Sequence, residues 1–171
     1  MAITLADTYY IKALDNYPYN LEEMLENLTY ALSYDDEHAE ANTLMARFYT
    51  YQVPRYDLAK DYANKALASD PTCLVAFNAL ATVLMYSVEI EELTRVVNFV
   101  CKLKEANKSY FKGLLAQAYE ATGKLKKAKR ILKVAISKSV EDSTIEELET
   151  QLSRVKKKIK KYKKLTKYKK D

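Results

Sequence analysis

The chain has 171 residues, of which 49% are apolar and 30% charged, and its net charge is +5. This balance excludes an intrinsically disordered chain, and the length suits one domain or one short repeat array. Two glycines and three prolines are too few for the turns of sheets and for phosphate-binding loops. The composition therefore favours an all-α fold.

The N-terminal residues carry no sign of a targeting segment. Residues 1–7 lack the basic segment and the long apolar core of a signal peptide. The longest apolar stretch, residues 73–86, is interrupted by Asn78 and Thr82, so it is too short and too polar to span a bilayer. These features favour a cytoplasmic protein.

Four tyrosines gather near the N-terminus: Tyr9, Tyr10, Tyr17 and Tyr19. Their spacing is close to that of a helix, and such aromatic clusters usually belong to the core. The alternative is an exposed patch against which another chain stacks.

The chain contains four similar segments, each predicted to form two amphipathic helices. Ala31, Ala66, Val100 and Ala135 occupy equivalent places, 34 or 35 residues apart. Within each segment the apolar residues recur at helical intervals of three and four, without the alternation of strands. We expect a repeat array over residues 1–142, divided at about 1–36, 37–71, 72–106 and 107–142, followed by a capping helix with a lysine-rich tail over 143–171.

The four segments, over about residues 4–140, resemble the tetratricopeptide repeat (TPR) family, and the second and fourth do so most clearly. The matching residues are Ala46, Tyr49, Tyr56, Ala59, Ala66 and Pro71 in the second segment, and Leu115, Ala116, Tyr119, Gly123, Ala128 and Ala135 in the fourth. The first and third match less well, because Met24 and Leu93 stand where the family has a small residue. The resemblance implies a right-handed α-solenoid of about four helix-turn-helix repeats with a long C-terminal capping helix. It also implies a protein–protein interaction scaffold or adaptor that binds a peptide or protein partner in a concave groove.

Helical phase places the expected groove on the first helix of each pair. The predicted partner-binding residues are Arg47, Tyr51, Asn78, Thr82, Tyr86, Tyr110 and Gln117, and the same faces carry Glu40, Thr43, Val75 and Glu120. Tyrosines give contact area at low entropic cost, and amides can bond a peptide backbone. The alternative is that these positions are only solvated. Some family members hold the C-terminal carboxylate of a chaperone with a set of Lys, Asn and Arg side chains. Here Arg47 and Asn78 are present, but the lysines and the final arginine of that set are missing, so we do not expect this chain to bind a chaperone tail.

The last segment is predicted to be one long helix. Residues 143–146 (Ser-Thr-Ile-Glu) form a capping-box sequence, which predicts that the helix begins there. An apolar stripe follows, formed by Ile145, Leu148, Leu152, Val155, Ile159 and Tyr162 and extended by Leu165 and Tyr168. The first half of the stripe is expected to pack on the last repeat.

The second half of this helix is strongly basic. Residues 154–171 carry a net charge of +10, which leaves −5 on the rest of the chain. The predicted basic tail comprises Arg154, Lys156, Lys157, Lys158, Lys160, Lys161, Lys163 and Lys164. Three interpretations stay open: a solvated helix end, an electrostatic contact with nucleic acid or an anionic membrane, and self-association into a homo-oligomer through the stripe.

Nothing in the sequence indicates an enzyme, a cofactor or a metal site. The only histidine, His38, lies in an acidic turn, where a surface position is expected. Cys73 and Cys101 lie in apolar runs and are expected to be reduced core thiols. No glycine-rich phosphate loop and no cluster with zinc-ligand spacing occurs. We therefore expect a binding protein without catalytic residues.

Overall fold

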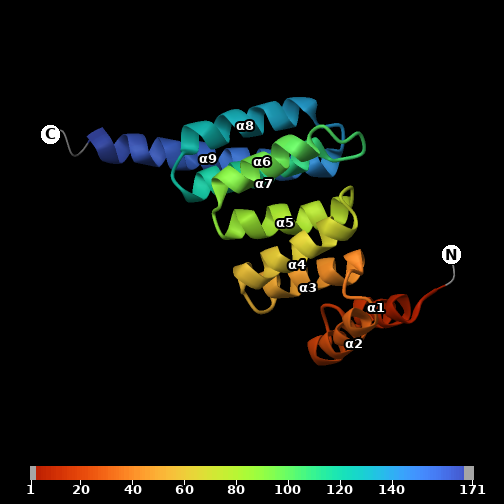
Figure 1. The fold of residues 1–171 in the computed structure, drawn as a ribbon. Coiled ribbons are helices and arrows are strands. Elements are labelled where there is room, and N and C mark those ends of the chain that lie inside the picture. Colours follow the sequence, from red (N-terminus) through yellow and green to blue (C-terminus); the bar gives the residue numbers. More distant parts are fainter. Residues whose placement is uncertain (1–2, 168–171) are drawn as a thin grey trace. The chain divides into compact units, whose positions relative to one another are not determined.

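A computed structural model of the chain describes residues 3–167, except for the side chains of residues 164, 166 and 167. Within these residues the fold is all-helical, as predicted, with nine α-helices and no strand (Figure 1). The helices are α1 (Leu5–Asn16), α2 (Leu21–Tyr34), α3 (Ala39–Tyr51), α4 (Tyr56–Ser69), α5 (Leu74–Tyr86), α6 (Ile90–Val100), α7 (Lys108–Ala121), α8 (Leu125–Lys138) and α9 (Asp142–Lys167).

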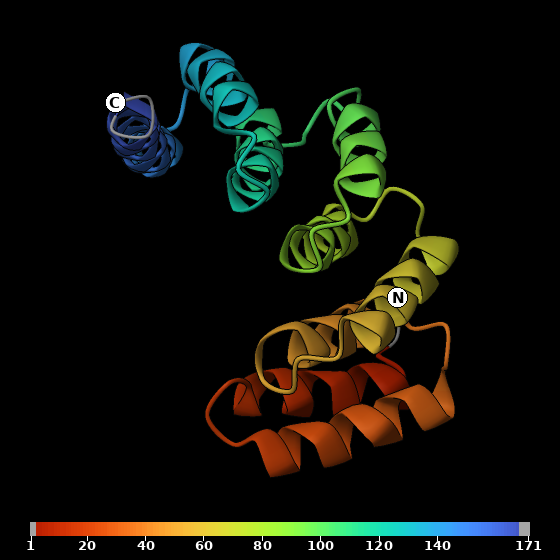
Figure 2. The ribbon, with the colours of Figure 1, turned by 90° about the vertical axis from the view of Figure 1, so that its left-hand side faces the viewer.

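The chain divides into two compact units, residues 1–83 and 84–171, and the boundary falls inside α5. We call them the N-terminal unit and the C-terminal unit. In the N-terminal unit α1 packs along α2 and α3 along α4, and in the C-terminal unit α8 packs along both α7 and α9 (Figures 1 and 2). Helix pairing between chain neighbours is therefore the basic element of both units.

Buried alanines allow the paired helices of the N-terminal unit to approach closely. Ala13, Ala31 and Ala63 are completely buried, and Met24 fills the place where the TPR family has a small residue. Tyr9, Tyr10 and Tyr17 are partly buried, and all three pack against this core, as expected from their spacing. Tyr19 does not follow them, since it lies in the turn between α1 and α2 and is 93% exposed.

His38 is buried, which contradicts the surface position expected from its acidic neighbours. It is only 8% exposed and caps α3, because the Ala41 N–H donates to its Nδ1 atom at 3.2 Å. On the other side of the ring, His38 Nε2 lies within hydrogen-bond distance of Asp7 Oδ1 of α1, at 3.1 Å. Hydrogen bonds from the Thr4 amide and hydroxyl, and then from His38, lower the pKa of Asp7. The histidine therefore ties the start of α3 to α1.

The C-terminal unit has its core between α7, α8 and α9. The buried residues of this cluster are Ala116, Leu125, Ala128, Leu132, Ala135, Leu148, Leu152 and Val155, with Ile159 partly buried against them. The first half of the α9 stripe thus covers the preceding helix pair, as the pattern predicted. Gly113 of α7 allows the close approach of α9, because a Cβ atom there would lie 2.9 Å from Leu148 Cδ2.

Helix α9 begins at Asp142, earlier than the capping-box sequence at residues 143–146 predicted. The Ile145 N–H donates to the Glu141 carbonyl at 3.0 Å, so Glu141 takes the N-cap position. The Glu141 carboxylate accepts from Thr144 Oγ1 at 2.8 Å and from Asn107 Nδ2 at 2.7 Å. These bonds attach the start of α9 to the start of α7. Helix α9 therefore begins before the capping-box sequence.

Candidate partner-binding sites

A small cleft in the N-terminal unit is lined by α1, α3 and the start of α5. We call it the α1–α3 cleft; its volume is about 80 Å³. Its lining residues are Tyr10, Leu14, Glu40, Thr43, Leu44, Arg47, Cys73 and Val75. The three helices are the first members of the first three helix pairs, on which the TPR resemblance places the binding surface.

Arg47 is the main donor group of this cleft. One face of its guanidinium lies over the Tyr17 ring, 4.9 Å from the ring centroid. Within the described part of the chain no carboxylate pairs with Arg47. Burial, and then the Glu40 carboxylate, raise the pKa of Tyr10, so its hydroxyl stays protonated and can donate. The cleft therefore offers N–H and O–H donors beside an apolar wall.

Four of the residues that helical phase placed on the groove face line this cleft: Glu40, Thr43, Arg47 and Val75. The others predicted for the N-terminal unit lie outside it. Tyr51 is exposed, one turn beyond Arg47, and Asn78 is exposed on α5. Thr82 is 5% exposed, and its hydroxyl is 3.4 Å from Asn78 Oδ1. Tyr10, Leu14, Leu44 and Cys73 line the cleft without having been predicted.

The groove residues predicted for the C-terminal unit lie on α5 and α7. Tyr86, the last residue of α5, is exposed, and Tyr110 and Gln117 are half-buried on α7. The Tyr110 ring meets that of Phe111 edge-on, with the ring centroids 5.6 Å apart. A groove that joins these residues into one surface stays a prediction.

Glu120, expected on the exposed face of α7, is instead the buried centre of an ion-pair network. It is 7% exposed and accepts hydrogen bonds from Arg154 Nε at 2.9 Å and Arg154 Nη2 at 2.8 Å. Lys158 Nζ lies 2.7 Å from its Oε1 atom. The Arg154 bonds lower the pKa of Glu120, burial opposes them, and Lys158 lowers it further. Two residues of the predicted basic tail thus hold α9 against α7.

Among the described side chains, the other lysines of the predicted basic tail have no part in this ion-pair network. Lys156, Lys157, Lys160, Lys161 and Lys163 are exposed on α9. The side chain of Lys164 and the whole of Tyr168 lie outside the described residues. The stripe residues Leu148, Leu152 and Val155 are covered by α7 and α8 of the same chain. Self-association through this half of the stripe would require α9 to separate from α7 and α8.

Helix α8 is a second basic segment, which the sequence analysis overlooked. It contains Lys126, Lys127, Lys129, Arg130, Lys133 and Lys138 and no acidic residue. Counted over the full sequence, residues 1–83 carry a net charge of −7 and residues 84–171 carry +12. A charge count over each expected helix, instead of over the C-terminal segment alone, would have found it.

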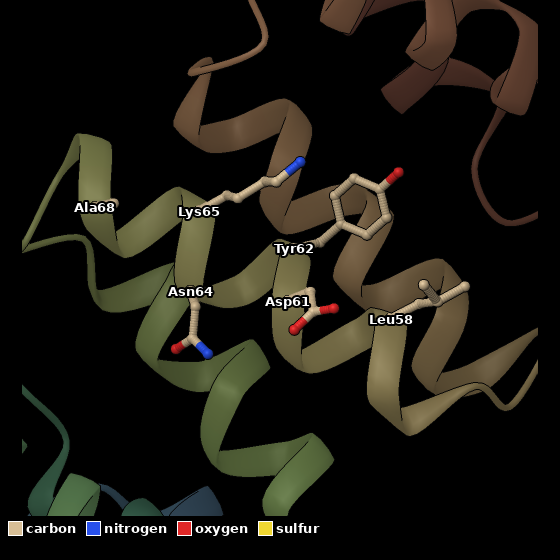
Figure 3. Close-up of a pocket in the computed structure, with 6 residues that line it drawn as sticks. All are labelled: Leu58, Asp61, Tyr62, Asn64, Lys65 and Ala68. Carbon is tan, nitrogen blue, oxygen red and sulfur yellow. The ribbon is translucent and has the colours of Figure 1, made fainter.

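Figure 3 shows the side chains of α4 that line a further hollow in the N-terminal unit, whose volume is about 500 Å³. Its lining residues are Leu58, Asp61, Tyr62, Asn64, Lys65 and Ala68. The Tyr62 ring stacks on the Tyr49 ring at a centroid distance of 5.7 Å, and Lys65 Nζ lies 5.4 Å from the centre of the Tyr62 ring. Because all six residues come from one helix, this hollow is a helix surface and we do not take it as a site.

Neither cysteine lies in the core, contrary to expectation. Cys73 precedes α5 and Cys101 follows α6, and both are free thiols and half-buried, because helix ends are less covered than helix centres. Among the described residues, no three His, Cys, Asp or Glu side chains are grouped so that they could hold a metal ion. No helix in residues 3–167 has the length and apolar character needed to cross a membrane.

Comparison with known proteins identifies the type of fold but no family. No family model matches the chain, and no curated protein matches it. The described helices form a TPR-type helical repeat fold, because the chain is similar to a solved structure of that type. This structure is the MamA RS-1 ArsTM double mutant; the TM-score is 0.66 and the identity 16%, over 92% of this chain and 98% of that chain. At this identity the likeness concerns the fold alone.

Proposed function

We propose that the protein is an interaction scaffold that holds an extended peptide segment of a partner protein, in the cytoplasm, at the α1–α3 cleft. The observation that carries the proposal is Arg47, which is held against Tyr17 in a cleft between the first helices and forms no ion pair within the described residues. Such an arginine can bind a partner's carboxylate or backbone carbonyls. Tyr51 and Asn78 are exposed and would extend the contact.

The size of the cleft supports a peptide over a small molecule. Pockets for small-molecule ligands usually measure about 300–1,000 Å³, well above the 80 Å³ of this cleft. A water molecule occupies about 30 Å³ of liquid, so the cleft holds roughly the volume of one small aliphatic side chain. Leu14 and Val75 supply apolar contacts for that side chain, and Arg47 and the Tyr10 hydroxyl supply bonds to the adjacent backbone.

The test is a selection of displayed peptides on the full chain, followed by affinity measurements on two charge-matched variants. We expect Arg47→Ala to weaken binding of the selected peptides about tenfold or more, because it removes charge-assisted hydrogen bonds. Arg55→Ala is the control, since Arg55 is exposed and its ion-pair partner among the described residues is Asp57, at 3.0 Å. We expect it to change affinity less than about twofold. Equal effects of the two substitutions would contradict the proposal.

A second candidate function is an electrostatic tether to nucleic acid or an anionic membrane. The exposure of Lys156, Lys157, Lys160 and Lys161 on α9 favours it. For duplex DNA, the slope of log affinity against log salt is about −0.9 per neutralised phosphate, so we expect a change of all four lysines to Gln to reduce its magnitude by about 3.6. A variant with Lys65, Lys102, Lys104 and Lys108 changed to Gln is the control. If both variants keep the wild-type slope, the tail makes no such contact.

A further inference from the structure

A larger cleft lies in the C-terminal unit, where α9 runs past the beginning of α8 (Figure 1). We call it the α8–α9 cleft; its volume is about 740 Å³. Its lining residues are Gly123, Lys124, Leu125, Lys126, Lys127, Ile159, Tyr162 and Lys163. It is separate from the α1–α3 cleft and contains none of the residues proposed there.

The α8–α9 cleft has an apolar centre and cations on both sides. Leu125 and Ile159 are the ends of the core between α8 and α9, and Tyr162 continues their line with 59% of its surface exposed. Lysines stand on the α8 side, and Lys163 stands on the α9 side. Among the described residues that line the cleft, none is acidic. A ligand that fills it must therefore be apolar on one face and negatively charged at its edges.

The helix dipole does not account for these lysines, although Lys127 Nζ also lies 5.5 Å from the centre of the Tyr119 ring. The N-cap of α8 is Lys124, whose side chain makes no capping hydrogen bond, and Lys126 and Lys127 occupy the first turn. Cations are disfavoured at the positive end of a helix dipole, where acidic residues are the stabilising choice. The first turns of α2 and α6 follow that rule, with two glutamates each. A local rule that is broken beside a cleft points to a role in binding.

We infer that the α8–α9 cleft binds an amphipathic helix of a partner protein whose apolar stripe is flanked by Asp and Glu. Such a helix places apolar side chains at i, i+3, i+4 and i+7 into a groove, and its carboxylates then meet the lysines on either side. A nucleic-acid backbone has no apolar surface that could fill the centre of the cleft. A membrane surface is flat, and would leave a concave cleft of this volume unfilled.

The inference is tested by selecting displayed helical peptides with random surface residues on the full chain. Two variants with equal change of charge are then compared: Lys126→Glu with Lys127→Glu, which alters the cleft, and Lys133→Glu with Lys138→Glu, which alters α8 outside the residues that line it. Glutamate is favourable in the first turn of a helix, so the cleft variant is expected to stay folded, as circular dichroism would check. Tyr162→Ser tests the apolar contact independently.

We expect the enriched peptides to be acidic and amphipathic, and to bind the cleft variant and Tyr162→Ser at least about tenfold more weakly than wild type. We expect the control variant to lose less than about threefold. The inference is overturned if no such peptides are enriched, or if both charge variants weaken binding equally. It is also overturned if phosphatidylserine vesicles or duplex DNA, and not peptides, depend on Lys126 and Lys127. Selected peptides that depend on Arg47 and not on these lysines would overturn this inference and support binding at the α1–α3 cleft.

Discussion

Ending the chain at Ser153 is expected to lower its free energy of unfolding by about 4 kcal/mol, whereas ending it at Lys163 should change it by less than about 0.5 kcal/mol. The shorter chain loses Val155, which is completely buried, and Ile159, which packs on the same core. A buried aliphatic side chain contributes about 1.5–3 kcal/mol. The shorter chain also loses Arg154, which leaves the buried Glu120 carboxylate without its bidentate partner.

Urea unfolding followed by circular dichroism measures this difference, with Leu165→Ala in the full chain as a control for an exposed residue of α9. If the chain ended at Ser153 is as stable as the full chain, the contacts of Arg154, Val155 and Ile159 do not stabilise the fold. The result also decides how the tail is tested in binding experiments. Ending the chain at Ser153 removes the tail lysines and also core residues of α9, so a loss of binding would have two possible causes. Substitution of the lysines with Gln changes the charge and leaves the core intact.

Elements that follow from local sequence were predicted well. The intervals of three and four between apolar residues predicted helices, and the described residues are all-helical. The stripe from Leu148 to Val155 predicted which face of α9 is buried. The predicted start of α9 was wrong, because Glu141 is held by Asn107, which lies 34 residues earlier in the chain. The capping sequence at residues 143–146 gives no sign of this contact.

Positions whose surroundings come from another helix were predicted less well. His38 has acidic neighbours in sequence, yet its ring is buried through contacts with Asp7 and Tyr10 of α1. Glu120 has the helical phase of an exposed residue, and only the docking of α9 covers it. Helical phase gives the face of a single helix, but it does not tell what packs on that face. The α1–α3 cleft is a case in point, because it depends on Tyr10 and Leu14 of α1 as much as on Arg47 of α3.

Replacing Glu120 with Gln should remove an acid-sensitive contribution to stability. The pKa of Glu120 is lowered in the folded protein by Arg154 and Lys158, below the ordinary value of about 4.3 in an unfolded chain. A carboxylate of this kind stabilises the fold at every pH above its unfolded pKa, and the contribution disappears as the pH falls through the lower folded pKa. The glutamine has nearly the same shape but no charge to lose.

At pH 7 we therefore expect Glu120→Gln to reduce the free energy of unfolding by about 1–3 kcal/mol. Arg154 is half exposed and can turn to water, which keeps the loss below that of a fully buried pair. The difference between variant and wild type should narrow progressively below about pH 4.3, where the wild-type carboxylate takes up its proton. Urea titrations at a series of pH values measure this, with Glu149→Gln on the exposed side of α9 as the matched control. A difference that stays constant down to pH 3 would mean that Glu120 acts by its shape and hydrogen bonds, and that its charge does not hold α9 in place.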